Sequence, residues 1–277
     1  MTDWTWDETL FAGAAKYYAA GRLPYAPGLA QAMAEALALD GAGRLLDIGC
    51  GPGTVTLLLA HLFESVVGVD ADGDMLLEAA RIAAERDIAN ASWVRLLAEG
   101  LPANLGTFRV ITFGHSFHWM DRERVARIVR GMLEPGGAVV QVDNRQQVED
   151  APEAGLPFPP PPNAEIGALI AHYLGTRRRA GQSFRDTSPD NEAAVFRAAE
   201  FGGHEQIPVP DGRLLTRAIG DIVSNTFSNS YSAPHLFGGR FEEFGADLRA
   251  LLLRASPTGQ FAVRLPANVL SIWRAAR

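Results

Sequence analysis

A glycine-rich turn between two apolar segments constrains the fold of this chain more than any other feature of its sequence. Residues 44–48 (RLLDI) are a short apolar run, and residues 54–63 (TVTLLLAHLF) are long and apolar enough for a helix packed on a sheet. Between them, Gly49, Gly51 and Gly53 let the chain turn sharply and let backbone N–H groups approach a ligand without a Cβ in the way. The sequence therefore predicts a buried strand, a tight turn and a helix whose N-terminus faces a ligand.

The spacing of these glycines separates two classes of ligand. A dinucleotide fingerprint has the pattern G-x-G-x-x-G, in which the last glycine lets the helix pack close beneath a pyrophosphate. Here the position where that glycine would fall is Thr54. Asp47 stands two residues before the first glycine, and its carboxylate would repel a pyrophosphate but suit a cationic ligand.

A second acid ends the next apolar strand. Residues 65–70 (SVVGVD) end in Asp70. An acid at the end of the second strand, about 20 residues beyond the turn, binds ribose hydroxyls in folds of this kind. NAD sites share this feature, so Asp70 alone does not discriminate between cofactors. Asp47, Thr54 and Asp70 together disfavour NAD.

The pattern D-x-G-x-G-x-G at 47–53, after a first strand, resembles motif I of the class I S-adenosylmethionine-dependent methyltransferases. Their cofactor carries an ammonium, a sulfonium and no phosphate. The stretch L-x-P-G-G at 133–137 is another hallmark of the family, in which Pro ends a helix and Gly supplies a turn. The resemblance implies S-adenosylmethionine as cofactor and S-adenosylhomocysteine as product. It covers residues 17–142 well and the rest weakly.

The resemblance also implies the fold: α/β, a Rossmann-like seven-stranded class I methyltransferase fold with strand 7 antiparallel and with helical cap insertions. We expect the cofactor-binding α/β core in residues 1–143 and 190–277, with an insertion at 211–259 before the last strand. Residues 144–189 are expected to form a proline-rich connector and a cap helix. The insertions and the N-terminal segment should roof the carboxyl edge of the sheet. Apolar periodicity predicts strands at 44–48, 65–70, 92–96, 109–113, 138–142, 205–209 and 261–273, and helices at 29–39, 54–63, 73–86, 121–133, 164–176, 191–201, 216–227 and 241–254.

The segment before the first strand carries a further resemblance. Residues 17–25 (YYAAGRLPY) are similar to the Tyr…Arg-Pro-x-Tyr segment found before motif I in a bacterial small-molecule subgroup that includes trans-aconitate methyltransferase-like proteins. There the segment folds over the cofactor, which implies that Arg22 or a tyrosine contacts the methionine carboxylate. The alternative is a surface lead-in with aromatic packing.

Three positions match the family's adenine contacts. Met75 sits where the family packs an apolar side chain against adenine, and a core methionine is the alternative. Ala98 and Glu99 follow the third strand, where the acid or its neighbouring N–H reads the adenine amino edge, although a lone acid on a loop is usually only solvated. The complete set of cofactor-binding residues that the resemblance implies is Asp47, Gly49, Cys50, Gly51, Gly53, Asp70, Ala71, Met75, Ala98, Glu99, Gly114 and Arg22.

Residues 114–121 (GHSFHWMD) follow the fourth strand and resemble an FHW…D segment of the same subgroup. In the parallel α/β order, residues just past this strand lie beside the sulfonium. His115 is the candidate general base, because a histidine there can titrate near neutrality. The alternative is a packed wall of Phe117, His118 and Trp119 that transfers no proton. The candidate substrate contacts are Tyr18, His118, Tyr231 and His235, the last two in a polar and aromatic loop at 228–239 that would serve as a lid.

Composition narrows the class of protein. Lysine and arginine number 25 against 32 aspartates and glutamates, and this net charge of −7 disfavours non-specific nucleic-acid binding. The sole cysteine, Cys50, excludes a disulfide framework or a cysteine-based zinc site within one chain, and no metal is expected. The N-terminus lacks a secretory pattern, and no apolar run approaches the roughly 18 residues of a membrane helix. We expect a cytoplasmic monomer or homodimer with a small-molecule substrate and no membrane or nucleic-acid partner.

The function that follows is methyl transfer from S-adenosylmethionine to an O-, N- or C-nucleophile of a small-molecule acceptor, with secondary metabolism as one setting. Because the sulfonium is already activated, the protein's main task is to align nucleophile, methyl carbon and sulfur, at roughly 3–3.5 Å before attack. A base is needed only where the acceptor must lose a proton. Two alternatives stay open: an NAD(P)-dependent Rossmann oxidoreductase and a non-catalytic S-adenosylmethionine-binding protein.

Overall fold

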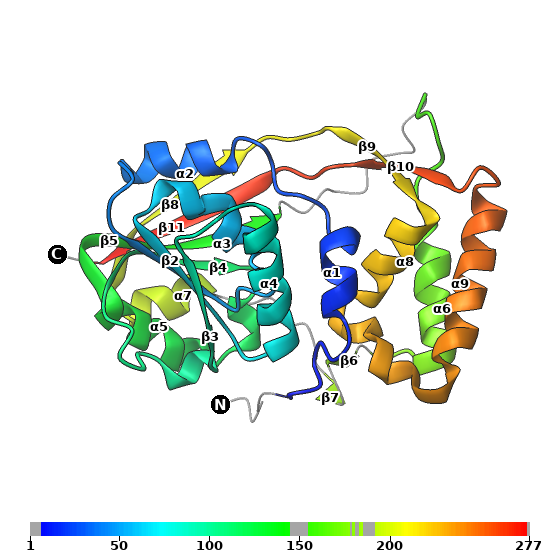
Figure 1. Ribbon diagram of the computed structural model, residues 1–277, viewed down its shortest axis with the longest axis horizontal. Coiled ribbons are helices and arrows are strands. Elements are labelled where there is room, and N and C mark those ends of the chain that lie inside the picture. The colour runs from blue at the N-terminus through cyan, green and yellow to red at the C-terminus, as the bar shows by residue number, and fades with distance from the viewer. Residues whose placement is uncertain (1–6, 145–154, 178, 181–182, 185–191, 276–277) are drawn as a thin grey trace.

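The computed structural model describes all residues except 1–6, 145–154, 178, 181–182, 185–191 and 276–277. Its central sheet has seven strands: β1 (Arg44–Ile48), β2 (Ser65–Asp70), β3 (Ala91–Arg95), β4 (Phe108–Gly114), β5 (Leu133–Asn144), β8 (Phe201–Val209) and β11 (Asn268–Ala275). Their order is β3-β2-β1-β4-β5-β11-β8 (Figure 1). Strands β1 to β5 pair in parallel, whereas β11 is antiparallel to both of its neighbours. The expected fold class is confirmed.

Helices cover both faces of this sheet. Successive residues of a strand point to opposite faces, so Leu46 of β1 packs with α5 (Arg122–Met132) and α7 (Glu192–Ala198). Leu45 packs on the other face with α2 (Leu29–Leu37) and α3 (Thr54–Leu59), and α4 (Gly73–Glu85) lies against β2 and β3. Burial on both faces explains why these strands read as nearly continuous apolar runs.

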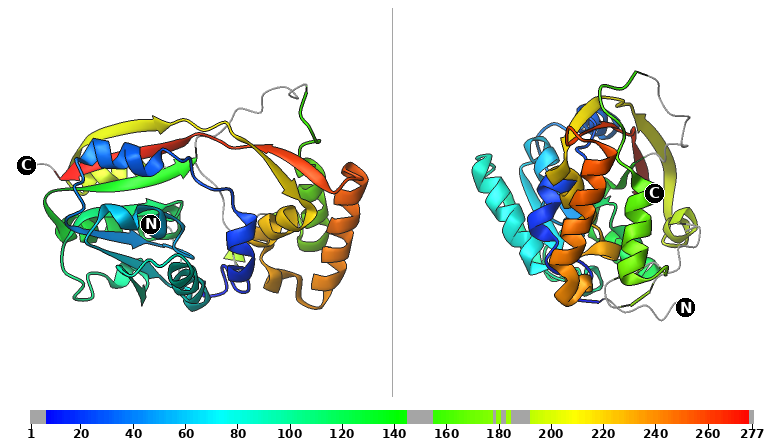
Figure 2. Two further views of the ribbon diagram at one scale, coloured as in Figure 1. Left: turned by 45° about the horizontal axis from the view of Figure 1, so that its top comes forward. Right: turned by 90° about the vertical axis from the view of Figure 1, so that its right-hand side faces the viewer.

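Four helices form a second body beside the sheet, here called the helical lobe: α1 (Ala15–Gly21), α6 (Asn163–Leu174), α8 (Ile219–Phe227) and α9 (Phe241–Ala255). Figures 1 and 2 show them side by side at one end of the molecule. Helices α6, α8 and α9 share an apolar cluster that contains Phe227, Phe244 and Phe261. Tyr17 of α1 packs on Phe227 with ring centroids 5.1 Å apart. The lobe therefore has a core of its own.

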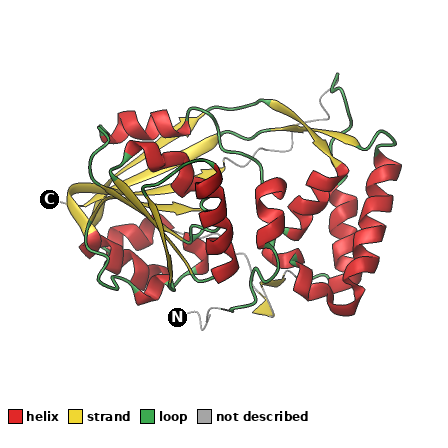
Figure 3. Cartoon of the chain, viewed as in Figure 1, coloured by secondary structure: helices red, strands yellow, loops and turns green. Residues whose placement is uncertain are grey.

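An antiparallel ribbon joins the lobe to the sheet. Strand β9 (Leu214–Ala218) leads from β8 into α8, and β10 (Gln260–Arg264) leads from α9 back to β11. Figure 3 shows this pair spanning the distance between the sheet and the helices. A second short ribbon pairs β6 (Arg179–Ala180) with β7 (Ser183–Phe184). Among the described residues, no helix is long and apolar enough to cross a bilayer.

The structure corrects the expected seventh strand. Residues 260–264 belong to the ribbon, and the antiparallel strand of the sheet is β11, which pairs with β8 as expected and also with β5. The helix expected from residue 216 begins at Ile219, because residues 214–218 are β9. Apolar alternation predicted strand character for the region near 261, but it carries no information about which strand is the partner.

The fifth and sixth strands also begin earlier than expected. Phe108 pairs with Leu133 and Val110 with Ala138, so the Pro-Gly-Gly stretch bulges out of a strand that already starts at residue 133. Strand β8 starts at Phe201 rather than at 205, directly after α7 ends at Ala198. Residues 151–154 of the proline-rich stretch lie outside the described residues, and α6 starts at its end.

A glycine makes the contact between α1 and α8 possible. A Cβ at Gly21 would lie 2.5 Å from the backbone carbonyl of Ser224, so Gly21→Ala should push the two helices apart and destabilise the protein by about 1–3 kcal/mol. The measurement is the free energy of urea unfolding. Gly220→Ala is the matched control, because that exposed glycine of α8 has no atom within 4 Å of the Cβ position. Equal stability of the two variants would contradict this account of the contact.

Candidate functional site

The glycine turn is hydrogen-bonded to the end of β2, and no side chain of the described residues covers its outer side at Gly51. The N–H groups of Gly49 and Cys50 donate to the Val69 carbonyl at 2.8 and 3.1 Å. Gly51 has a φ of 54°, a region that L side chains rarely adopt, and a Cβ built there would have no neighbour within 4 Å. The turn thus presents backbone to open space.

Asp70 lies beside this turn. Its Oδ2 accepts a hydrogen bond from Gly51 N–H at 2.7 Å, and its Oδ1 accepts one from Asp72 N–H at 2.9 Å. Burial raises the pKa of this carboxyl above its usual value, and these hydrogen bonds oppose that shift. Each carboxylate oxygen has a second lone pair, so the group can still accept hydrogen bonds from a ligand in the space beside the turn.

Asp47 forms the floor of the site. It is 1% exposed, and its oxygens accept hydrogen bonds from Thr56 Oγ1 at 2.6 Å and Thr112 Oγ1 at 2.8 Å. Burial raises its pKa to about 6, in spite of the two hydroxyl donors. No positive side chain pairs with it among the described residues. A ligand cation nearby would stabilise its ionised form.

Two adjoining cavities open at the carboxyl edge of the sheet. The inner cavity encloses about 660 Å³ of empty space, part of it open to solvent, and is lined by Phe11, Tyr18, Gly49, Gly51, Asp70, Ala71, Met75, Leu96, Leu97, Ala98, Glu99, Gly114, His115, Ser116, Trp119 and Met120. The outer cavity encloses about 1270 Å³ on the same basis. Its lining adds Arg22, Leu23, Tyr25, Asp47, Cys50, Thr54, Val55, His118, Asn144, Asn225, Asn229, Ser230 and Tyr231. The core, α1 and the rest of the lobe all contribute to the outer cavity.

His115 stands where both cavities meet. Its Nε2 accepts a hydrogen bond from Asn144 N–H at 3.1 Å, and its Nδ1 lies 3.3 Å from Asp143 Oδ1. A nitrogen that accepts a backbone N–H carries no proton, so the neutral ring has its proton on Nδ1 and donates it to Asp143. Desolvation lowers the pKa of His115 and raises that of Asp143 to about 6. Both ring nitrogens are engaged in this arrangement.

Arg22 reaches the outer cavity from the end of α1. Its guanidinium lies over the Tyr18 ring, 4.9 Å from the centroid, and its Nη2 donates to the Ser228 carbonyl at 2.9 Å. Its Nε is buried and has no hydrogen-bond partner among the described residues. An unsatisfied buried donor on a cation is costly, so this nitrogen points to an anionic ligand group in the cavity.

The comparisons with known proteins agree with this geometry. Residues 45–137 match the family model described as a methyltransferase domain. An uncharacterized methyltransferase of Synechocystis sp. is 33% identical over 112 residues, 39% of this chain and 50% of that protein. The uncharacterized methyltransferase YcgJ of Bacillus subtilis is 31% identical over 102 residues, 36% of this chain and 40% of that protein. Residues 45–137 therefore belong to a methyltransferase domain.

Two further comparisons define how far this similarity extends. The crystal structure of YcgJ superposes on this chain with a TM-score of 0.50 and 17% identity, covering 90% of this chain and 98% of that one, which shows a shared fold. A Talaromyces variabilis protein named as an S-adenosyl-L-methionine-dependent Diels-Alderase is 32% identical over 122 residues, 41% of each chain. The chain thus matches half or less of the length of each of these three curated relatives.

Most of the residues that the sequence singled out line the two cavities. Two do not. Gly53 caps α3, and a Cβ there would lie 2.7 Å from the Trp93 ring. His235 lies near the N-terminal segment, with its Nδ1 3.2 Å from the Ala12 carbonyl. Glu99 reaches the inner cavity, but its Oε1 accepts from Asp121 N–H at 2.7 Å at the start of α5.

The structure also adds residues that sequence reasoning missed. Phe11 and Asn225 line the cavities from segments with no motif, and only their packing brings them there, whereas Asn229 belongs to the loop at 228–239 that was expected to serve as a lid. Phe11 meets Trp119 edge to face, with centroids 6.0 Å apart. Of the three residues of the alternative wall, His118 and Trp119 line the outer cavity, whereas Phe117 is buried in the sheet core against Phe196. Trp119 could be found from the FHW segment alone.

The raised pKa of Asp47 gives a stability test. Between its ordinary value of 3.8 and its folded value of about 6, the folded protein holds a proton that the unfolded chain has released. The contribution of Asp47 to stability therefore falls as the pH rises through this window. Relative to Asp47→Asn, we expect wild type to lose about 2–3 kcal/mol of unfolding free energy between pH 4 and pH 7.

Urea unfolding of both proteins at several pH values measures this difference. Asp74→Asn is the matched control, because Asp74 is exposed at the start of α4 and its substitution should leave the pH dependence unchanged. A wild-type-minus-Asp47→Asn difference that is constant across the pH range would refute the burial assigned to this carboxyl.

Proposed function

We propose that this protein binds S-adenosylmethionine at the glycine turn and transfers its methyl group to a small-molecule acceptor in the outer cavity. The observation that carries the proposal is the pair of acids at the ends of β1 and β2. Asp47 and Asp70 flank a turn whose Gly51 has open space beyond it. Two carboxylates disfavour a phosphate and favour hydroxyl and ammonium groups.

The residues present fit each part of this cofactor. Asp70 would accept hydrogen bonds from the ribose hydroxyls, and Met75 and Ala98, both buried at the inner cavity, would contact adenine. Asp47 would favour the ammonium, and the unpartnered Nε of Arg22 would bind the methionine carboxylate. When bound, the sulfonium supplies a methyl group that needs no further activation.

The chain's own task at the outer cavity is to orient the acceptor and exclude water. Tyr18 and His118, together with Asn225 and Tyr231 of the lobe, line this space. His115 is the proposed base for an acceptor that must lose a proton. Because Nδ1 carries the proton, only Nε2 can accept another, so His115 can act as a base only after its Nε2 releases Asn144 N–H. An acceptor that arrives already ionised needs no such release.

The resemblance of residues 17–25 to the trans-aconitate methyltransferase-like subgroup supports a small-molecule acceptor, because α1 and its tyrosine lie over the cavities. An NAD(P)-dependent oxidoreductase is disfavoured by Asp47 and Thr54. One relative is named as a Diels-Alderase, so cofactor binding alone does not establish methyl transfer. A non-catalytic binding protein is the remaining alternative.

The deciding experiment incubates the protein with S-adenosylmethionine and a panel of small acids and phenols, and follows S-adenosylhomocysteine and methylated product by mass spectrometry. Methylated product that forms with the protein, and forms more slowly with Asp70→Ala at a subsaturating cofactor concentration, supports the proposal. Tight binding of S-adenosylhomocysteine with no methylated product across the panel favours a binding protein. Binding of NADH in its place refutes the cofactor assignment.

The ribose contact can be tested alone. Asp70→Ala should weaken S-adenosylhomocysteine binding by about 1–3 kcal/mol, the scale of losing a buried charged hydrogen bond, as measured by isothermal titration calorimetry. Asp74→Ala is the control, because this exposed acid lines neither cavity. Unchanged affinity in Asp70→Ala would count against the contact.

The carboxylate contact calls for a comparison of ligands. Arg22→Leu should weaken S-adenosylhomocysteine binding roughly tenfold, because a charge-assisted hydrogen bond is lost. It should leave 5′-methylthioadenosine unaffected, since that ligand lacks the amino-acid tail. Calorimetric titration of both ligands into both proteins measures this. An equal loss for the two ligands would mean that Arg22 acts through packing against Tyr18 instead.

A further inference from the structure

Asn268 is a buried polar residue that touches neither cavity. It is the first residue of β11 and is 1% exposed. In the register of the sheet it stands between Asn144 of β5 and Val209 of β8. Nothing in the sequence motifs singles it out. A buried carboxamide needs hydrogen-bond partners, and those of Asn268 lie on segments that form the outer cavity.

Both ends of the Asn268 carboxamide are engaged. Its Oδ1 accepts a hydrogen bond from Ala26 N–H at 2.6 Å, and its Nδ2 donates to Asn144 Oδ1 at 2.7 Å. The backbone donor fixes which atom is the oxygen, because only Oδ1 can accept it. Asn268 therefore fastens the link between α1 and α2 to the end of β5.

Asn144 connects Asn268 to the outer cavity. Asn144 lines the outer cavity, and its own N–H donates to His115 Nε2 at 3.1 Å. The chain of contacts is thus Ala26, Asn268, Asn144, His115 and, through Nδ1 at 3.3 Å, Asp143. Because Asn144 Oδ1 is engaged by Asn268, its Nδ2 donor is left without a partner among the described residues. The Asn144 Nδ2 group can therefore donate a hydrogen bond to a substrate bound in the outer cavity.

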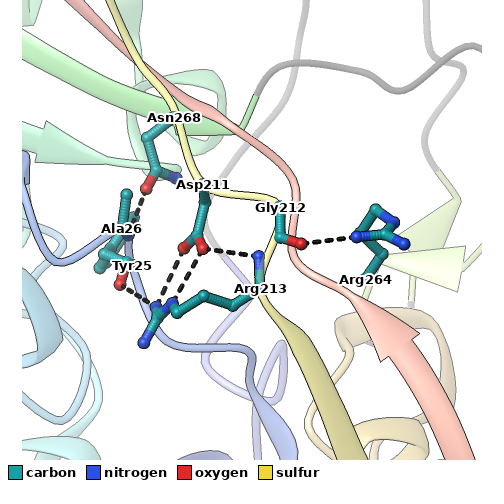
Figure 4. A network of polar contacts seen from close by, with 7 residues as sticks. All are labelled: Tyr25, Ala26, Asp211, Gly212, Arg213, Arg264 and Asn268. Carbon is teal, nitrogen blue, oxygen red and sulfur yellow. Dashed lines mark hydrogen bonds and ion pairs between the residues drawn. The ribbon is translucent and has the colours of Figure 1, made fainter.

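The same place ties together three segments that join the sheet to the lobe (Figure 4). Arg213 donates to the Tyr25 carbonyl at 3.2 Å and pairs with Asp211 at 2.8 Å. Arg264 donates to the Gly212 carbonyl at 2.7 Å. Tyr25, which lines the outer cavity, is thus held at its own carbonyl and, through Ala26 N–H, by Asn268. Directional hydrogen bonds and an ion pair thus fix how these segments cross.

We propose that Asn268 is a positioning residue for the acceptor side of the site, which sets the orientation and tautomer of His115 through Asn144. This inference rests on the proposed function, in which the methyl acceptor binds beside His115. It assigns no contact between Asn268 and cofactor or acceptor. Its physical content is the pair of hydrogen bonds on Asn144: its side-chain Oδ1 accepts from Asn268, and its backbone N–H donates to His115 Nε2.

The test reads the His115 ring directly. Long-range ¹H–¹⁵N correlation spectra at a pH where the ring is neutral distinguish the two tautomers, and a His115→Gln variant assigns the signals. Wild type should show the proton on Nδ1. Asn268→Leu should shift the ring toward a mixture with the Nε2 tautomer, because Asn144 is no longer held. Asn144→Ala cuts the same series on its other side and should give the same shift, which provides the test should Asn268→Leu fail to fold.

Asn90→Ala is the matched control. The Asn90 carboxamide donates to the carbonyls of Ala60 and Phe63 at 2.9 and 3.0 Å, so its loss costs stability without touching this series, and His115 should keep the wild-type pattern. A wild-type pattern in both Asn268→Leu and Asn144→Ala would overturn the proposal. So would a shifted pattern in Asn90→Ala, because the signal would then report general destabilisation.

Titration with S-adenosylhomocysteine separates this inference from the proposed function. Asn268→Leu should bind it within about twofold of wild type, since the ribose and adenine contacts are remote and independent. No binding by wild type would refute the proposed function while leaving the tautomer result interpretable. A large loss of affinity for S-adenosylhomocysteine in Asn268→Leu would show that Asn268 also affects the cofactor side, and would contradict the proposal.

Discussion

Two backbone hydrogen bonds hold the site together: those from the N–H groups of Gly49 and Cys50 to the Val69 carbonyl. They fold the end of β1 onto the end of β2 and thereby bring the buried Asp47 and the half-buried Asp70 to one edge of the sheet. Because both donors lie in the glycine turn, the turn cannot move without losing them. The proposed contacts of the two acids with the cofactor depend on this junction.

The acceptor side of the site is built differently from the cofactor side. The inner cavity is lined mainly by residues near the ends of adjacent strands, whose spacing the sheet fixes. The outer cavity depends on the helical lobe, which packs through α1 on α8 and is joined to the sheet by the β9–β10 ribbon. The proposed methyl donor would thus lie among strand ends whose spacing the sheet fixes. The proposed methyl acceptor would lie among side chains from segments distant in the sequence.

This difference explains what the sequence could predict. Asp47, Asp70 and the glycines lie within one strand-turn-helix unit and its neighbour, so local spacing and family resemblance were sufficient to place them together. Asn225 and Asn229 reach the cavity only because Gly21 allows α1 to approach the α8 backbone. The Asn144 bond to His115 requires that β4 and β5 be neighbours with a particular register. Strands β9 and β10 contain apolar residues that indicate strand character. Neither segment by itself shows that the other is its pairing partner.

The antiparallel strand has a consequence for the order of assembly. Among the described residues, β8 pairs only with β11, and β11 alone joins β8 to β5. As the chain emerges from a ribosome, strands β1 to β5 can pair once residue 144 is free, whereas β8 must wait until residues 268–275 have been made. During synthesis from the N-terminus, the edge of the sheet that holds Asp47 and Asp70 would therefore form well before Asn268 could bind Ala26 and Asn144. A nascent chain would thus form the proposed ribose-binding edge first and the proposed acceptor cavity last.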